Sequence, residues 1–283
     1  MILAFGAILM NIHIGIEKGE PSPGVHLANN YEIGVGGKAA LQALAAAKSN
    51  ARVAAVGYIG DDHYGKNILL RLRQHGVITS GVGRHEQIPT GTHIQIGYNK
   101  VQTIIAHGAA AKANHEQIPT DILHNDTLLL LQDELPYEQN APLLPKAKEC
   151  KTKVILNAGV ICDIEKYDLN MLDYVITDYH HADIIKYVKS KAPNKLITIF
   201  EHGAAISTSV QQDAIEIEDK PPIDKSCAED AFCGTFAAAI FAGQSEASAL
   251  KRAAVAYALT ESKKGGYHAL PYPDDIKEAL ANL

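Results

Sequence analysis

Residues 128–134 read Leu-Leu-Leu-Leu-Gln-Asp-Glu, an apolar run that ends in three polar side chains. A short run that is apolar at every position is typical of a strand buried on both faces of a parallel sheet. Similar runs occur at 154–156, 174–177 and 196–199, each after a stretch with the composition of a helix. Alternating strands and helices form right-handed crossover units. The second half of the chain is therefore expected to form a parallel sheet covered by helices.

Strands and helices of the same kind are expected outside this region. Residues 2–10 form an apolar run that ends at Asn11, which indicates a buried first strand. Two aspartates at 61–62 precede a predicted helix over 63–75 and have the chemistry of a helix cap. Two long helices are expected near the C-terminus, over 230–242 and 245–263.

Two segments do not fit a strand–helix alternation. Residues 88–107 alternate polar and apolar side chains, which is the period of a half-exposed antiparallel pair. Residues 17–36 contain turn-forming residues and then a short alternating stretch that predicts an exposed strand. The expected fold class is a three-layer α/β/α domain over 1–283 with a central, mainly parallel sheet. A small β-sheet lid, at about 12–35 and 88–112, is expected over its carboxyl edge.

Composition excludes several classes of protein. The 283 residues carry a formal charge of −6 and contain no basic block, which argues against nucleic acid or an anionic membrane as a partner. Residues 1–16 lack the basic start and the cleavage site of a signal peptide. The cysteines show no paired spacing, which predicts neither a disulfide framework nor a zinc site; they are Cys150, Cys162, Cys227 and Cys233. We expect a cytoplasmic protein.

The strongest chemical signal is the stretch Asp224-Lys225-Ser226-Cys227-Ala228-Glu229-Asp230, which leads directly into an apolar helix. The unpaired N–H groups at a helix N-terminus bind anions, and an aspartate there can accept a proton from an attacking hydroxyl. The alternative interpretation is that Asp230 only caps the helix. Neither a Walker A motif nor a GxGxxG fingerprint is present.

Several motifs together resemble those of the ribokinase-like (PfkB) family of carbohydrate and nucleoside kinases. The family's N-terminal signature is similar to residues 36–43, Gly-Gly-Lys-Ala-Ala-Leu-Gln-Ala, and continues in residues 56–65. The strand followed by Gln-x-Glu-x-Pro resembles residues 131–136. The C-terminal Asp-Thr-x-Gly-Ala-Gly-Asp signature resembles residues 224–230, and a late Leu-Pro matches residues 270–271. The motifs follow the family's order and cover essentially the whole chain.

This resemblance implies a ribokinase-like fold and ATP-dependent phosphoryl transfer to a hydroxyl of a sugar or nucleoside, with Mg²⁺ bridging the nucleotide phosphates. It implies Asp230 as the base and the N–H groups of Cys227, Ala228 and Glu229 as the anion hole. The residues implied to bind the acceptor are Asn11, Gly36, Gly37, Lys38 and Glu134. Those implied at the nucleotide are Asp178, Thr198, Gly203 and Ala254. A K⁺ site at Asp224 and a homodimer formed through the lid are further implications.

The departures from the family pattern cluster at the expected site. The family's acceptor-binding aspartate is Asn11 here, and the asparagine of the Gly-Gly-Lys motif is Leu41. Both glycines of the anion hole are replaced, by Cys227 and Glu229. On the nucleotide side the family's glutamate, glycine and asparagine are replaced by His181, Phe200 and Ala254. These changes favour an alternative function, a catalytically weakened member that binds a small molecule or a partner without efficient phosphoryl transfer.

Other residues in these motifs allow two interpretations each. Cysteines 227 and 233 are either small buried residues or reactive thiols. His180 and His181 are either loop residues or ligands. Lys38 is either a solvated lysine at a helix start or a residue that faces the ligand. Glu134 directly follows an apolar strand, at the edge where α/β sheets bind ligands, which favours a functional role.

Overall fold

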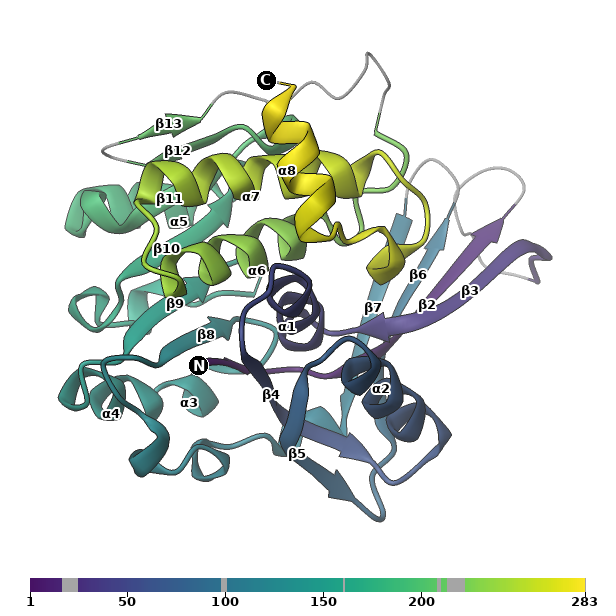
Figure 1. The fold of residues 1–283 in the computed structure, drawn as a ribbon. Coiled ribbons are helices and arrows are strands. Elements are labelled where there is room, and N and C mark those ends of the chain that lie inside the picture. The colour runs from purple at the N-terminus through teal and green to yellow at the C-terminus, as the bar shows by residue number, and fades with distance from the viewer. Residues whose placement is uncertain (17–24, 98–100, 160, 208–209, 213–221, 283) are drawn as a thin grey trace.

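The structure is a computed structural model that describes the whole chain except residues 17–24, 98–100, 160, 208–209, 213–221 and 283. In these described residues a nine-stranded sheet lies between two layers of helices, and a four-stranded sheet projects from one side (Figure 1). The spatial order of the large sheet is β13 (Gln211–Gln212), β12 (Ala205–Ser207), β11 (Leu196–Ile199), β10 (Tyr174–Asp178), β9 (Lys153–Asn157), β8 (Leu128–Gln132), β1 (Ile2–Phe5), β4 (Val53–Gly60) and β5 (Ile78–His85). Its pairs are parallel except at the edge formed by β12 and β13.

The helices divide between the two faces of this sheet. One face is covered by α1 (Lys38–Lys48), α2 (His63–Gln74), α6 (Ala228–Phe241) and α7 (Glu246–Glu261), with α8 (Pro273–Ala281) against α7. The other face is covered by α3 (Tyr137–Asn140), α4 (Leu143–Glu149) and α5 (Ala182–Lys191). None of the helices in the described part of the chain is long and apolar enough to cross a membrane.

The apolar run at 128–131 explains why the sheet is buried on both sides. Leu128 and Leu130 pack into the core below α6 and α1, whereas Leu129 and Leu131 pack into the core below α4. Alternate side chains of a strand point to opposite faces, so a strand covered on both faces must be apolar at successive positions. The predicted central strands and the mainly parallel sheet are confirmed.

The predicted single strand over residues 2–10 is wrong in its extent. The chain leaves the large sheet after β1, and β2 (Leu9–Ile16) belongs to the four-stranded sheet. The break falls at Gly6, where a Cβ would lie 2.3 Å from Oε1 at the end of the Gln132 side chain and 3.3 Å from the Ala39 Cβ. The residues directly before and after Gly6 are all buried, so the apolar pattern continues across the break. The sequence pattern therefore does not predict the turn.

The four-stranded sheet has the order β3-β2-β6-β7, with β3 (Ala28–Gly36), β6 (Thr90–Gly97) and β7 (Val101–Gly108). It therefore begins at Leu9, earlier than the boundary expected at residue 12. The turn expected within 17–24 lies outside the described residues. By strand alternation, Asn11, His13, Glu32 and His93 share one face, and isoleucines dominate the other. We call this four-stranded sheet the lid, because the sequence predicted a small β-sheet over the carboxyl edge of the large sheet.

Candidate active site

Asp230 lies in the first turn of α6 and is almost completely buried. Its Oδ1 accepts a hydrogen bond of 3.0 Å from Gln42 Nε2 of α1. Burial raises the pKa of Asp230 to about 6, although the charge of Lys38 opposes this effect. The N-cap of α6 is Cys227, and no side chain caps it. Asp230 is therefore not the cap of its helix, and its position in the first turn leaves it available for acid–base chemistry.

The N-terminus of α6 contains the three residues predicted to form an anion hole. Cys227 and Ala228 are buried, and the Ala228 N–H already donates to the Lys225 carbonyl at 3.2 Å. Burial raises the pKa of the Cys227 thiol, which favours the interpretation of this residue as a small buried side chain. Glu229 has helical geometry within α6, so this position needs no glycine-specific backbone conformation.

The Glu229 side chain points towards the centre of the site. Its Oε2 lies 2.9 Å from Lys38 Nζ, and its Oε1 accepts a hydrogen bond of 2.7 Å from Asn157 Nδ2. Burial opposes ionisation of Glu229, but Lys38 and the Asn157 amide outweigh it and lower the pKa of the carboxyl. A carboxylate of this chain thus lies beside the helix N-terminus where the family's glycine leaves space.

The Lys38 side chain is held by partners from two other elements, β9 and α6. Its Nζ donates to Asn157 Oδ1 at 3.0 Å and pairs with Glu229. Burial lowers the pKa of Lys38, but the negative charges of Glu229 and Asp230 outweigh burial and raise this pKa well above its usual range. The Lys38 side chain is thus a fixed positive charge that points to the centre of the site. It is not a solvated lysine at a helix start, which was one of the two interpretations that the sequence allowed.

Three amides connect these groups, and sequence reasoning missed all three. Gln42 Nε2 donates to Asn157 Oδ1 at 2.9 Å as well as to Asp230, and Gln132 Nε2 donates to Gln42 Oε1 at 3.0 Å. Two signals were available. Gln42 lies four positions after Lys38, on the same face of one helix. Asn157 and Gln132 are the last residues of the apolar strands β9 and β8, at the carboxyl edge of the sheet, and Glu134 lies two positions after Gln132.

Glu134 follows β8 and is buried beside α1. Its Oε2 accepts a hydrogen bond of 2.6 Å from the Lys38 backbone N–H, and its carbonyl pairs with His107 Nε2 of the lid at 2.5 Å. Burial raises the pKa of Glu134 to about 7, against the effect of Lys38. The two glycines before Lys38 permit close packing: a Cβ at Gly36 would overlap the Asn11 side chain, and Gly37 has a φ of 80°.

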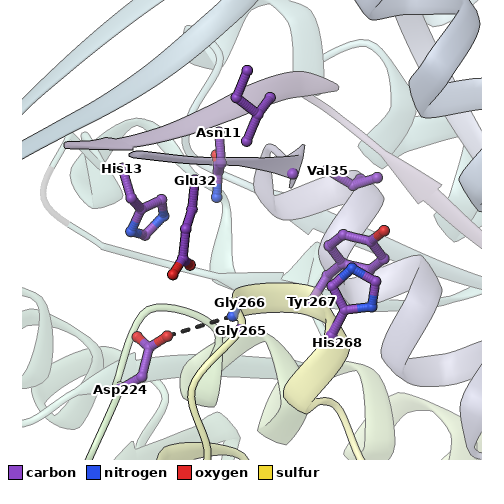
Figure 2. Close-up of a pocket in the computed structure, with 11 residues that line it drawn as sticks. Asn11, His13, Glu32, Val35, Asp224, Gly265, Gly266, Tyr267 and His268 are labelled. Atoms are coloured by element: carbon purple, nitrogen blue, oxygen red, sulfur yellow. Dashed lines mark hydrogen bonds between the residues drawn. The ribbon is translucent and has the colours of Figure 1, made fainter. Parts of the chain in front are cut away.

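A cavity of about 270 Å³ lies between the lid and the turn that follows α7 (Figure 2). Asn11, His13 and Glu32 line it from the lid, and Asp224 and residues 265–268 line it from the opposite side. The buried Asn11 places its Oδ1 3.2 Å from His93 Nδ1. The cavity has the size for a small sugar. Of the residues predicted to bind the acceptor, Asn11 lines this cavity, whereas Gly36, Gly37, Lys38 and Glu134 do not, and the predicted base Asp230 does not line it either.

Asp224 is engaged by backbone groups. Its Oδ1 accepts from the Ser226 N–H at 3.0 Å and its Oδ2 from the Gly266 N–H at 3.4 Å, as Figure 2 shows for the second bond. Burial opposes ionisation, but these hydrogen bonds lower the pKa of Asp224. Both oxygens thus already accept N–H groups, an arrangement that does not by itself fit a K⁺ site.

The predicted nucleotide residues are not all brought together. Gly203, with a φ of 76°, packs on α7, where its Cβ would lie 2.7 Å from the Ala254 carbonyl oxygen. Thr198 instead lines a cavity next to α5 together with Phe200, on the opposite face of the sheet from α7. Asp178 ends β10 and pairs with the exposed His180 at 2.5 Å, which supports the loop interpretation of that histidine.

Among the described residues, no group of three or more His, Cys, Asp or Glu side chains is arranged to hold a metal ion. A Mg²⁺ ion held by nucleotide phosphates and water needs no such group, because one or two carboxylates are enough to bind it.

The chain thus combines a three-layer α/β/α domain with a separate small sheet, and a buried carboxylate lies in the first turn of α6. Residues 1–178 match the pfkB family carbohydrate kinases, and the chain belongs to this family. It is 27% identical to the ribokinase of Bacillus subtilis (strain 168), with 99% of both chains covered. It is 26% identical to the deoxyribokinase of Salmonella typhi, with 89% of both chains covered.

Solved structures confirm the fold. Arabidopsis thaliana ribokinase complexed with ribose and ATP gives a TM-score of 0.82 at 23% identity, over 99% of this chain and 98% of that one. Ribokinase from Cryptococcus neoformans var. grubii in complex with ADP gives a TM-score of 0.84 at 18% identity, over 98% of both chains. The chain therefore has the three-layer ribokinase fold with a small second sheet.

Proposed function

We propose that this carbohydrate-kinase homologue transfers a phosphoryl group from ATP to a hydroxyl of a sugar or sugar-like small molecule. The observation that carries the proposal is Asp230: a buried carboxylate with a pKa raised to about 6, in the first turn of α6. A base with a pKa near this value is ionised at neutral pH and still accepts a proton effectively. The relatives support this choice, because one of them was solved with ribose and ATP.

The chemistry follows from the groups at the site. Asp230 accepts the proton of the acceptor hydroxyl, whose oxygen then forms the bond to the γ-phosphorus while the bond to ADP breaks. Gln42 orients the Asp230 carboxylate through its 3.0 Å hydrogen bond. Lys38 and the N-terminus of α6 supply the positive field for the transferred group. Magnesium, when bound with the nucleotide, neutralises the phosphates.

A second candidate function is favoured by a specific observation. Glu229 pairs with Lys38 at 2.9 Å and thus offsets the positive charge that the transferred phosphoryl group needs. Such a protein would bind a sugar or nucleoside in the cavity beneath the lid but transfer phosphate slowly. The two candidates differ in turnover and share acceptor binding.

Further parts of the proposal concern assembly and ions. The isoleucine-rich face of the lid leaves apolar side chains exposed, Ile33 at 44% and Ile104 at 55%, which supports a homodimer formed through this face. We also propose that the nucleotide lies near Asp178, Gly203 and Ala254, and not at Thr198, which faces α5 on the other side of the sheet. A K⁺ ion at Asp224 would have to share its oxygens with the Ser226 and Gly266 N–H groups. A cytoplasmic location is the last part of the proposal.

A thermal-shift screen followed by a kinase assay separates the candidates. Ribose, deoxyribose and nucleosides are tested with and without ATP and Mg²⁺, because any ligand of the native state raises the melting temperature. Stabilisation by an acceptor together with acceptor-dependent ADP release supports the kinase. Stabilisation without ADP release supports the second candidate. Absence of stabilisation by any of these compounds contradicts both.

A further inference from the structure

The lid joins the main domain at a compact junction formed by the end of β4, the start of α2 and the start of β6. Thr90 is the first residue of β6 and is buried. The Gly60 N–H, at the end of β4, donates to Thr90 Oγ1 at 3.0 Å. A Cβ at Gly60 would lie 2.5 Å from the Thr90 nitrogen, so β4 and β6 approach each other as closely as glycine permits.

Asp62 connects this junction to α2. It is the N-cap of α2, and its Oδ1 accepts the Gly65 N–H at 2.8 Å. The same oxygen accepts the Thr90 hydroxyl at 2.7 Å, and Oδ2 accepts the Thr90 backbone N–H at 2.7 Å. Burial opposes ionisation, but these hydrogen bonds lower the pKa of Asp62. The cap expected at residues 61–62 is thus Asp62, which uses its second oxygen to bind the lid.

We infer that Asp62 is a positioning residue that holds the start of β6 and thereby places the polar face of the lid over the acceptor site. A cavity of about 490 Å³ lies on one side of this junction, between α2 and residues 89–92. Asp62 and Thr90 both line this cavity, and the hydrogen bonds between them fix the position of Thr90. The expected effect on KM rests on the proposed function, whereas the expected effect on the position of β6 does not.

The effect reaches the acceptor site through His93. This residue lies three positions after Thr90 on β6, and its Nδ1 is 3.2 Å from Oδ1 of the buried Asn11. Burial lowers the pKa of His93, and the charges of His13 and Lys38 act in the same direction. Asn11 lies beside His93 on the paired strand β2 and moves with it. A shift of the lid away from the main domain would therefore hydrate His93 and move it away from Lys38, so His93 reports where the lid lies.

The decisive variant is Asp62→Asn. Asparagine keeps one oxygen, which can still cap α2, but it replaces the acceptor for the Thr90 N–H by an amide donor. Asp61→Asn is the matched control, because Asp61 is exposed and its side chain contacts only Lys66 at 3.4 Å among the described residues. Thr90→Ser retains the hydroxyl bonds and serves as a conservative variant; Thr90→Val removes them.

Hydrogen exchange of the native protein tests the structural part. We expect Asp62→Asn to raise exchange about tenfold to a hundredfold in residues 89–97, as loss of one buried, charge-assisted bond allows. Exchange within α2 should change little. The pKa of His93, assigned by NMR with His93→Gln, should move up towards that of an ordinary histidine. With ribose as the probe acceptor, KM should rise while kcat changes less.

The outcomes separate this inference from the proposed function. If Asp62→Asn and Asp61→Asn give the same exchange in β6 and the same His93 titration, Asp62 is only a helix cap and the inference is wrong. Equal loss of protection throughout the chain also contradicts it, because that result describes general destabilisation. If ribose is not phosphorylated by the parent protein, exchange and the His93 titration still decide the role of Asp62.

Discussion

Glu229→Gly is the substitution that most directly tests why this site departs from its family. The Lys38 and Glu229 side chains are 20% and 29% exposed, so an effective dielectric constant near 20 is appropriate for charges between them. A phosphoryl charge about 4 Å from the Glu229 carboxylate is then repelled by about 4 kcal/mol. Since about 1.4 kcal/mol corresponds to a factor of ten, this repulsion would lower the rate or the ATP affinity about a thousandfold. Partial exposure of Glu229 to solvent weakens the repulsion, and we expect Glu229→Gly to raise the rate or the affinity by about tenfold to a thousandfold.

The assay measures ATP affinity by calorimetry and ADP release with ribose as acceptor. Glu229→Gln removes the charge while it keeps the size of the side chain and an acceptor for Asn157 Nδ2, so it separates electrostatics from space. Glu149→Gln on the exposed surface of α4 is the control. If Glu229→Gly and Glu229→Gln leave both ATP affinity and turnover at the parent's values, the Lys38–Glu229 pair does not limit phosphoryl transfer. The second candidate function then loses its support.

Three further predictions follow from the buried charges. Asp230→Asn should lower turnover by orders of magnitude without lowering the melting temperature at pH 7, because the neutral amide avoids burial of a charge; equal turnover in parent and variant would exclude Asp230 as the base. The folded-state pKa of Glu134, about 7, lies above its ordinary value, so this group's contribution to stability should be lost as pH rises from about 4.5 to 7. Urea unfolding should show a flatter pH dependence in Glu134→Gln, and an unchanged slope would contradict the pKa assignment. Lys48, whose pKa burial lowers to about 8, should make stability rise with pH between about 8 and 10, and Lys48→Met should abolish that rise in the same measurement.

The parts of the fold that the sequence predicted are those set by local periodicity. The leucine run of β8 and the alternation in β6 and β7 each follow from which faces are buried, and both are confirmed. The break between β1 and β2 was not predictable from the apolar pattern, because the residues on both sides of the break are buried although the two strands belong to different sheets. Local periodicity predicts which faces of a strand are buried, but not where the chain passes from one sheet to another.

The candidate site likewise contains residues that the sequence predicted and contacts that it did not predict. Asp230 and Glu134 were identified from motifs that lie within a few residues of them. The pairing of Lys38 with Glu229 joins positions 191 apart, and the Gln42–Asn157 bond joins positions 115 apart. Sheet register and helix placement bring these groups together, and neither is encoded in the spacing of a motif. The sequence therefore predicted the charged groups of the candidate site but not the amides that connect them.

Gly37 is the single residue between β3 of the lid and α1, and this connection has a mechanical consequence. It is enclosed by backbone on the side where a Cβ would lie 2.4 Å from the Ala7 carbonyl oxygen. Lys38 follows at once, with its N–H on Glu134 and its ammonium group on Glu229. The end of the lid strand and the lysine of the candidate site are therefore separated by one residue whose conformation neighbouring backbone atoms restrict. A substitution at Gly37 is expected to disturb the position of β3 and that of Lys38 together.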